Sequence, residues 1–271
     1  MNAKEPLKRL FFGIEAHALW PSSFPTGRII DEKERHFTLS FLGNISFEIL
    51  KTNLFKLNKL FYPVTLGYSG WFDSCLFLPH HHPNVVAFQP KWTKKPLLLE
   101  QIQKNLTDWL IELGYQADSR EWLPHATVCR KPFNQQEWLQ AFSPFPFYTG
   151  NIHLYESLGN IRYSPLWTFP VKPPFEEIEH IADIAFVIRG LSIQELYWNG
   201  FIALSFKSPD LIHYFIQSDE LFELDEVIML LNQCMSFADT HIGCPLKAVS
   251  FHGEAIKGKD GIYEWEMIVD V

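Results

Sequence analysis

Three prolines within nine residues divide this 271-residue chain into two segments. They lie in the stretch 169–177, where Pro170, Pro173 and Pro174 favour an extended backbone and disfavour helix at the residue before each. The charge changes at the same place: residues 1–175 carry 18 Lys and Arg against 14 Asp and Glu, whereas residues 176–271 carry 5 against 17. We therefore expect two domains, residues 1–171 and 178–271, joined by a Pro-rich linker at 172–177.

The composition is that of a folded, unexported protein. With 47% hydrophobic and 20% charged residues, both segments have material for buried cores. No run of about 18 apolar residues is present, and the start lacks the apolar stretch of a signal peptide. The four cysteines are spread along the chain without a C-x-x-C pair. We expect a cytoplasmic protein that has no membrane partner.

Both segments mix strand and helix patterns, which predicts an α+β class. In the first segment, apolar spacing predicts helices over 47–60 and 99–113, and short apolar runs predict strands over 10–14, 85–88, 152–155 and 166–169. In the second, we expect a strand over 179–190, helices over 192–206 and 225–237, and strands over 247–252 and 263–271.

Two short motifs hold the candidate chemistry. In the segment 36–43, polar and apolar residues alternate, which is the period of a half-buried strand. His36 and Thr38 then share one face, while Phe37, Leu39 and Phe41 enter the core. The segment 125–130 repeats this arrangement, because His125 and Thr127 share a face and Ala126 and Val128 share the other.

Such a pair of motifs suits acid–base catalysis on a phosphate. One neutral histidine takes a proton from the nucleophile while the other, protonated, gives one to the leaving oxygen. The hydroxyls of Thr38 and Thr127 are suited to donate hydrogen bonds to phosphate oxygens. His36 and His125 are therefore the candidate catalytic residues, and no metal is needed for this chemistry.

These residues carry a resemblance to a known family. The segments 27–43 and 124–130, together with the hairpin from Tyr155 to Tyr163, resemble the 2H phosphoesterase superfamily over about residues 8–171. The nearest group is the RNA 2′,3′-cyclic phosphodiesterases, also called 2′-5′ RNA ligases. The resemblance implies a bilobal fold in which the two H-x-T strands face a central cleft. It also implies that His36 is the acid that protonates O3′ and His125 the base, although the sequence alone does not order them.

Three features of the first segment remain open in sequence. Arg130 has the opposite strand parity to His125, so that it contacts phosphate only if the strand ends or bulges there. Phe11 and Phe12 either stack on a terminal base or belong to the core. The three histidines 80–82 lie between two prolines, and we expect an exposed loop at a cleft edge rather than a metal site.

The second segment resembles archease, a family that assists an RNA ligase joining 2′,3′-cyclic phosphate ends. The matching stretches are 180–183, the helix after Leu224, and the ending 247–271. The resemblance implies a divalent metal held by Asp183 and Asp270 and an RNA ligase as partner. Two departures weaken it: Ile181 replaces the family's Thr, and the stretch 239–247 is shorter than in a full archease.

Together these features predict an enzyme that hydrolyses RNA 2′,3′-cyclic phosphate ends to 2′-phosphates, in RNA repair or tRNA processing. Thr38, Thr127 and Arg130 are the candidate phosphate-binding residues. Two alternatives stay open. One is a non-catalytic factor that binds RNA ends or an RNA ligase, and the other is a phosphodiesterase of small cyclic nucleotides.

Overall fold

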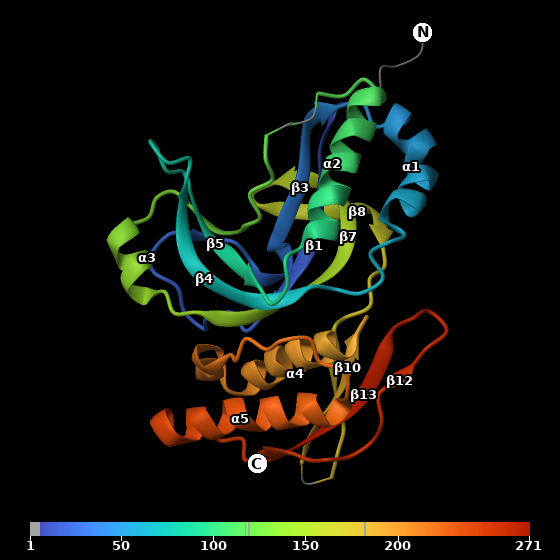
Figure 1. Ribbon diagram of the computed structural model, residues 1–271. Coiled ribbons are helices and arrows are strands. Elements are labelled where there is room, and N and C mark those ends of the chain that lie inside the picture. Colours follow the sequence, from blue (N-terminus) through green and yellow to red (C-terminus); the bar gives the residue numbers. More distant parts are fainter. Residues whose placement is uncertain (1–5, 117, 119, 182) are drawn as a thin grey trace.

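The computed structural model describes residues 6–116, 118, 120–181 and 183–271. It has two units, each made of a sheet and helices, stacked on one another (Figure 1). The expected α+β class is therefore confirmed for both. No helix in the described part of the chain has the length and apolar character needed to cross a membrane.

The first unit contains eight strands, three α-helices and a short 3-10 helix in its described residues. They are β1 (Lys8–Ala18), β2 (Arg28–Ile29), η1 (Glu32–Glu34), β3 (His36–Ile45), α1 (Glu48–Phe61), β4 (Ser69–Leu78), β5 (Val85–Trp92), α2 (Leu97–Glu112), β6 (Ala126–Arg130), α3 (Gln135–Ala141), β7 (Phe145–Gly159) and β8 (Arg162–Phe169). The helices and strands expected in this segment are all present.

The sheet of the first unit is closed on itself. Its strands follow the order β1-β3-β6-β5-β4-β7, and β1 also pairs with β7, so the path returns to its start. β1 pairs along both edges: its Gly13 lies opposite Thr38 of β3 and opposite His153 of β7. β8 extends the sheet beyond β7, and β2 pairs with β6. Closure leaves fewer open edges and fixes which strands become neighbours.

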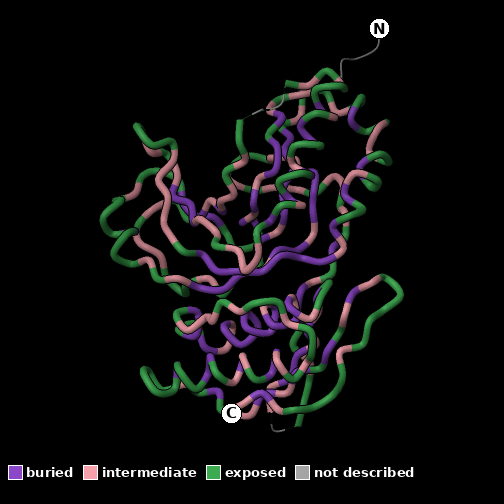
Figure 2. The backbone as a smooth tube through the Cα atoms, viewed as in Figure 1, coloured by how far each residue is buried: buried purple, intermediate pink, exposed green. Residues whose placement is uncertain are grey.

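The closed sheet surrounds and supports one apolar core. Rings from several strands meet there: Phe37 lies 5.9 Å from Phe72 and 5.4 Å from Phe147, measured between ring centroids. The buried stretches follow the centres of these strands (Figure 2). α1 and α2 pack against one another, with α2 against β3 and α1 against β8. Phe12 is fully buried in this core, so that it belongs to the core and is not available to stack on a base.

The second unit is a smaller sheet covered by two helices. Its elements are β9 (Phe175–Ile178), β10 (Ile184–Gly190), α4 (Ile193–Lys207), the 3-10 helix η2 (Pro209–Tyr214), α5 (Leu224–Ile242), β11 (Ala248–Val249), β12 (Ile256–Lys257) and β13 (Tyr263–Asp270). The sheet order is β11-β13-β10-β9. As expected, Ser192 caps α4, since its side chain accepts from the Glu195 backbone N–H at 3.2 Å.

Two sequence expectations near the boundary need correction. Residues 175–177, expected in the linker, belong to β9, which pairs with β10 through Glu176 opposite Val187. Phe175 is buried in the second core and supplies the reason for this pairing. The strand expected from residue 179 begins only at Ile184. The turn from the prolines into the second sheet is therefore shorter than the sequence indicates.

α4 lies between the first unit and α5, and it is buried on nearly all sides (Figure 1). Residues 199–205 are buried without interruption, a pattern typical of a helix enclosed by protein. Gly200 lets α5 approach, because a Cβ there would lie 3.3 Å from Leu231 of α5. The helix thus joins two cores instead of covering one.

Side chains of the first unit complete the core of the second. Trp71 of β4 is only 5% exposed and belongs to the second core, where its ring lies 5.6 Å from Phe215. Tyr148 of β7 packs against Phe175 at 5.0 Å. Ser69 donates a 2.6 Å hydrogen bond to Asn199 of α4, and Lys94 pairs with Glu195 at 2.5 Å.

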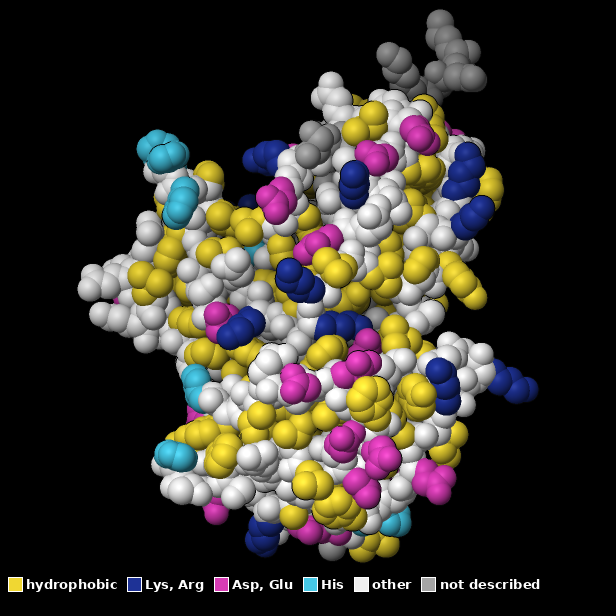
Figure 3. Space-filling model, viewed as in Figure 1, with side chains coloured by type: hydrophobic (Ala, Val, Ile, Leu, Met, Phe, Trp, Pro, Cys, Tyr) yellow, Lys and Arg dark blue, Asp and Glu magenta, His cyan; other side chains and the backbone are white. Residues whose placement is uncertain are grey.

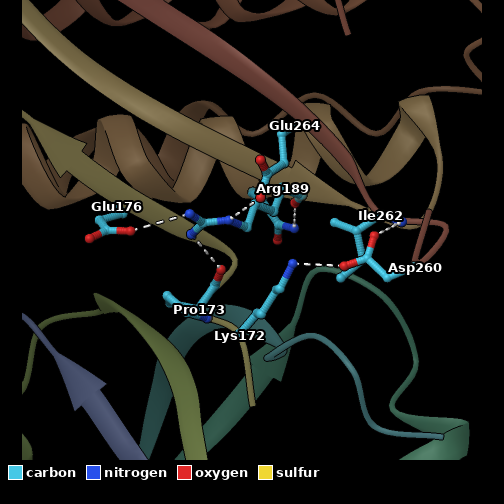
Figure 4. A network of polar contacts seen from close by, with 8 residues as sticks. Lys172, Pro173, Glu176, Arg189, Asp260, Ile262 and Glu264 are labelled. Atoms are coloured by element: carbon cyan, nitrogen blue, oxygen red, sulfur yellow. Dashed lines mark hydrogen bonds and ion pairs between the residues drawn. The ribbon is translucent and has the colours of Figure 1, made fainter. Parts of the chain in front are cut away.

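A polar network surrounds the chain where it passes between the units (Figure 4). Arg189 of β10 contacts Glu176 at 3.2 Å and Glu264 at 2.9 Å, and it donates to the Pro173 carbonyl at 3.3 Å. Lys172 pairs with Asp260 at 2.7 Å, but both side chains are exposed and contribute little. Arg189 therefore ties the proline segment to two strands of the second sheet.

Asn199 offers a test of the joint between the units. Its side chain is buried, accepts from Ser69 and donates to the Arg189 carbonyl at 2.6 Å. We expect Asn199→Ala to lower the free energy of unfolding by about 2 to 4 kcal/mol, because two buried polar groups each lose a hydrogen bond. Urea denaturation measures this. The matched change Asn105→Ala, on the exposed face of α2, is expected to stay within about 0.5 kcal/mol of wild type. Equal effects of the two changes would contradict the role of Asn199 in holding the two units together.

Candidate active site

The two motif histidines lie on neighbouring strands in closely similar settings. β3 and β6 pair through Phe37 opposite Ala126, so that His36 and His125 precede the paired residues. The Nδ1 atom of His36 lies 2.8 Å from the Glu34 carbonyl oxygen, and that of His125 lies 2.8 Å from the Leu123 carbonyl oxygen. A carbonyl only accepts, so each Nδ1 carries the hydrogen. In the neutral imidazoles, each Nε2 is then an unprotonated acceptor.

His36 is held inside an aromatic group. Phe11 stacks on its ring at 4.7 Å, Tyr163 meets it edge-on at 5.2 Å, and Tyr155 lies at 5.6 Å. Phe11 also stacks on Tyr155 at 5.1 Å and is buried. The hairpin of β7 and β8 thus supplies two rings that fix the orientation of His36. Phe11 packs against the histidine rather than standing free.

The protonated forms of both histidines are destabilised in the free protein. Burial lowers the pKa of His36 to about 4, and the charges of His125 and Arg130 add to this effect. Burial also lowers the pKa of His125 below its usual 6.5. In the free protein both imidazoles are therefore shifted toward the neutral form.

A cavity of about 590 Å³ opens beside His36. Its lining includes His36, Thr38 and three arginines, Arg9, Arg28 and Arg130. No carboxylate is among its lining residues in the described part of the chain. The cavity is therefore suited to an anion.

Arg130 reaches this cavity because β6 bulges. Cys129 lies opposite Val86 and Thr127 lies opposite Ala87, so that Val128 is an extra residue with no partner on β5. A bulge shifts the alternation of faces by one residue. Val128 and Cys129 are consequently both buried, and Arg130 returns to the face of His125 and Thr127. The open question of strand parity is thereby answered.

A similar bulge overturns one sequence expectation. Thr38 lies opposite Gly13 and Ser40 lies opposite Phe12, which leaves Leu39 as the extra residue of β3. The prediction that Phe41 enters the core is wrong: its side chain is 43% exposed and lines the cavity, and Leu42 is buried in its place. Phe37 and Leu39 are buried as expected.

His125 lines a second cavity, of about 560 Å³, between the β4–β5 hairpin and α2. The two cavities share Thr38 and Phe41, and this face of the molecule is hollowed there (Figure 3). Trp122 forms part of the wall and donates to the Thr38 carbonyl at 2.8 Å. Thr127 is half-buried and is not among the described residues that line either cavity. The structure thus brings His36, Thr38, Arg130 and His125 to adjoining cavities.

Sequence reasoning missed a partly buried polar network near His36. His153 of β7 contacts Glu15 of β1 at 2.8 Å and Thr168 of β8 at 2.9 Å. Burial by itself raises the pKa of Glu15, but hydrogen bonds from His153, His17 and the Asn151 backbone outweigh it and hold that pKa well below its usual range. Glu34 is also buried and accepts from the Tyr163 backbone at 2.8 Å. The signal in the sequence is a polar residue inside an otherwise apolar strand pattern, as at Glu15 and His153.

The histidines 80–82 are exposed at the tip of the β4–β5 hairpin, as expected (Figure 3). The base of that hairpin, Leu78 and Pro79, lines the His125 cavity. All four cysteines are free. Among the described residues, no group of three or more His, Cys, Asp and Glu side chains is arranged to hold a metal ion.

The two candidate metal ligands of the second unit lie at the same end of two paired strands. β10 begins at Ile184, directly after Asp183, and Ile184 lies opposite Val269, the residue before Asp270. His180 lies 3.8 Å from Asp183. These residues do not make a complete ligand set, and the metal expectation stays a prediction.

Comparisons with known proteins give only remote likenesses. No family model and no curated protein matches the chain. A solved structure described as a phosphoesterase is 22% identical, covers 62% of this chain and 99% of its own, and has a TM-score of 0.46. E. coli LigT complexed with 3′-AMP is 23% identical, with coverages of 61% and 98% and a TM-score of 0.45. A protein of Thermus thermophilus is 15% identical, with coverages of 61% and 98% and a TM-score of 0.40. At these identities and TM-scores the likenesses carry no functional conclusion.

The pKa of His36 makes stability depend on pH in a defined direction. Between about pH 6.5 and about pH 4, the unfolded chain binds a proton at residue 36 that the folded protein excludes. The free energy of unfolding therefore falls as the pH falls through this window, by up to roughly 3 kcal/mol from this group. We expect the free energy of unfolding of His36→Gln to fall less than that of wild type over the same pH range.

Chemical denaturation at several pH values measures the free energy of unfolding of both proteins. In the difference between wild type and His36→Gln, the contributions of the other titrating groups cancel. His81→Gln, at the exposed hairpin tip, is the matched control and is expected to follow wild type. If the curves for His36→Gln and wild type were parallel, the imidazole of His36 would not be excluding a proton.

Proposed function

We propose that this protein hydrolyses RNA 2′,3′-cyclic phosphate ends to 2′-phosphates by two-histidine acid–base catalysis. The observation that carries the proposal is the duplicated setting of His36 and His125, each with Nδ1 bonded to a carbonyl two residues earlier and with Nε2 left for proton transfer. A purely structural role gives no reason for two such groups beside adjoining cavities with an arginine-rich wall.

In this mechanism, water attacks phosphorus and the bond from phosphorus to O3′ breaks. One histidine, neutral, takes the proton of the attacking water at its Nε2, and the other, protonated, gives its Nε2 proton to O3′. We propose the order that the family resemblance implies, with His36 as the acid and His125 as the base.

Hydrogen-bond donors stabilise the charge that develops on the phosphate oxygens. Thr38 lines both cavities, and its hydroxyl is suited to this role, as is the guanidinium of Arg130. Thr127 completes the set only if the substrate reaches its half-buried hydroxyl. No step of this chemistry is assigned to a metal ion.

The alternatives differ in what they require of these groups. A factor that only binds RNA ends needs the arginines but not two proton-transfer groups. A phosphodiesterase of small cyclic nucleotides uses the same histidines on a shorter ligand. For the second unit, a divalent metal at Asp183 and Asp270 and an RNA ligase partner stay predictions.

Replacing either histidine tests the proposal. With an oligoribonucleotide that ends in a 2′,3′-cyclic phosphate, we expect His36→Asn and His125→Asn to lower kcat by about 100- to 10,000-fold, because each removes one proton-transfer group. Separation of the cyclic-phosphate and 2′-phosphate products measures the rate. His81→Asn is the matched control and is expected to leave kcat unchanged. No turnover by wild type, or full turnover by both variants, would contradict the proposal.

A further inference from the structure

The arginine-rich wall of the His36 cavity contains more positive charge than one phosphate requires. Arg9 comes from β1, Arg28 from β2 and Arg130 from β6. None of the three forms an ion pair with a carboxylate among the described residues. Three unpaired guanidinium groups on one wall repel one another, and an anionic ligand removes that cost.

Arg28 and Arg130 are direct cross-strand partners. The pairing of β2 with β6 places Arg28 opposite Arg130 and Ile29 opposite Cys129. Opposite residues of an antiparallel pair have Cβ atoms roughly 5 Å apart, and like charges in such positions destabilise the pair. β2 has only two residues and both are exposed, so its own side chains bury nothing that explains the pairing.

The close approach of β2 to β6 depends on the residue before Arg28. At Gly27, a Cβ would lie 2.2 Å from the Sγ of Cys129, the neighbour of Arg130. Any other residue at position 27 therefore pushes Arg28 away from Arg130 or displaces Cys129, which is buried. The local backbone is thus adapted to hold two arginines side by side.

Arg28 lines the same cavity as His36 and Arg130, but it lies farther along β6 than the histidine pair. β6 pairs with β3 at Ala126 and with β2 at Arg130, four residues further on. The candidate for the reacting phosphate is Arg130, on the strand that follows His125. Arg28 extends the positive wall beyond Arg130 and is therefore suited to a second anionic group of the same ligand.

Arg9 of β1 adds a third guanidinium group to the lining of the same cavity. Its guanidinium lies over the ring of Phe41, 5.1 Å from the ring centroid, and Phe41 stands at the junction of the two cavities. Stacking on an aromatic face holds an arginine in place without using its hydrogen-bond donors. Since neither Arg9 nor Arg28 has a carboxylate partner among the described residues, their donors are available to a ligand.

We propose that Arg9 and Arg28 form a second phosphate subsite, which binds the phosphate next to the reacting one in the substrate. This inference rests on the proposed function. It names the substrate class more narrowly: nucleotides that carry a phosphate on the 5′ side of the terminal cyclic phosphate, in preference to a bare nucleoside 2′,3′-cyclic phosphate. That phosphate comes either from the internal linkage of an RNA chain or from a 5′-phosphate on a single nucleotide.

Four ligands separate these sources. They are a nucleoside 2′,3′-cyclic phosphate, the same nucleotide with a 5′-phosphate, a dinucleotide ending in a 2′,3′-cyclic phosphate, and that dinucleotide with an uncharged methylphosphonate linkage. For wild type we expect kcat/KM to be at least about tenfold higher for a ligand with the second charge than for its uncharged partner. If only the dinucleotide pair shows a preference, the second phosphate comes from the internal linkage of an RNA chain. If both pairs show a preference, the subsite accepts either an internal linkage or a 5′-phosphate.

The variants Arg28→Gln and Arg9→Gln test the residues. Each is expected to remove most of the preference for the second charge while leaving kcat/KM for the bare nucleoside cyclic phosphate within about twofold of wild type. Lys59→Gln, on the exposed face of α1, is the matched control for the loss of one positive charge. It is expected to keep the wild-type preference.

Equal kcat/KM for charged and uncharged partners in wild type would overturn the inference and leave the proposed function intact. So would an Arg28→Gln variant that lowers kcat/KM equally for all four ligands. If wild type turns over none of them, the proposed function fails, and calorimetric Kd values decide the inference alone. In that case tighter binding of the charged ligands, lost in Arg28→Gln, supports the subsite, and equal Kd values overturn it.

Discussion

The pairing of β1 with both β3 and β7 is the constraint on which the candidate site depends. It closes the sheet, and closure makes β3 and β6 neighbours although about 90 residues separate their motifs. The same pairing places the β7–β8 hairpin against His36, since Gly13 lies between Thr38 and His153. The backbone pairing of one long strand therefore assembles His36, its aromatic group and the Glu15–His153 pair, and the pairing of β3 with β6 adds His125.

The electrostatics of the site follow from this assembly. Burial and nearby positive charge disfavour protonation of His36, and the arginine wall lacks carboxylate partners among its described lining residues. Guanidinium groups gathered in this way repel one another, and a bound anion relieves that repulsion. The positive wall and the acidic second unit thus belong to different surfaces, although the chain has a net charge of −8.

The second unit is a structural continuation of the first rather than a separate attachment. The side chains of Trp71 and Tyr148, on strands of the first sheet, pack into the second core, and α4 is buried between the two units. The proline segment is fixed by Arg189 and leads directly into β9. A change at the joint therefore acts on both cores.

Period-2 alternation and helical spacing by themselves determined the α+β class and most elements, and they singled out the two histidines with their threonines as candidates, because these patterns depend only on neighbouring residues. The tertiary structure alone decided that Phe41 points outward, that Arg130 points into the cavity and that Arg28 stands opposite it. Each of these depends on a bulge or a register, at Leu39, Val128 and β2. A bulge exists only relative to the partner strand, and the partner is chosen by closure of the sheet, which no local pattern specifies.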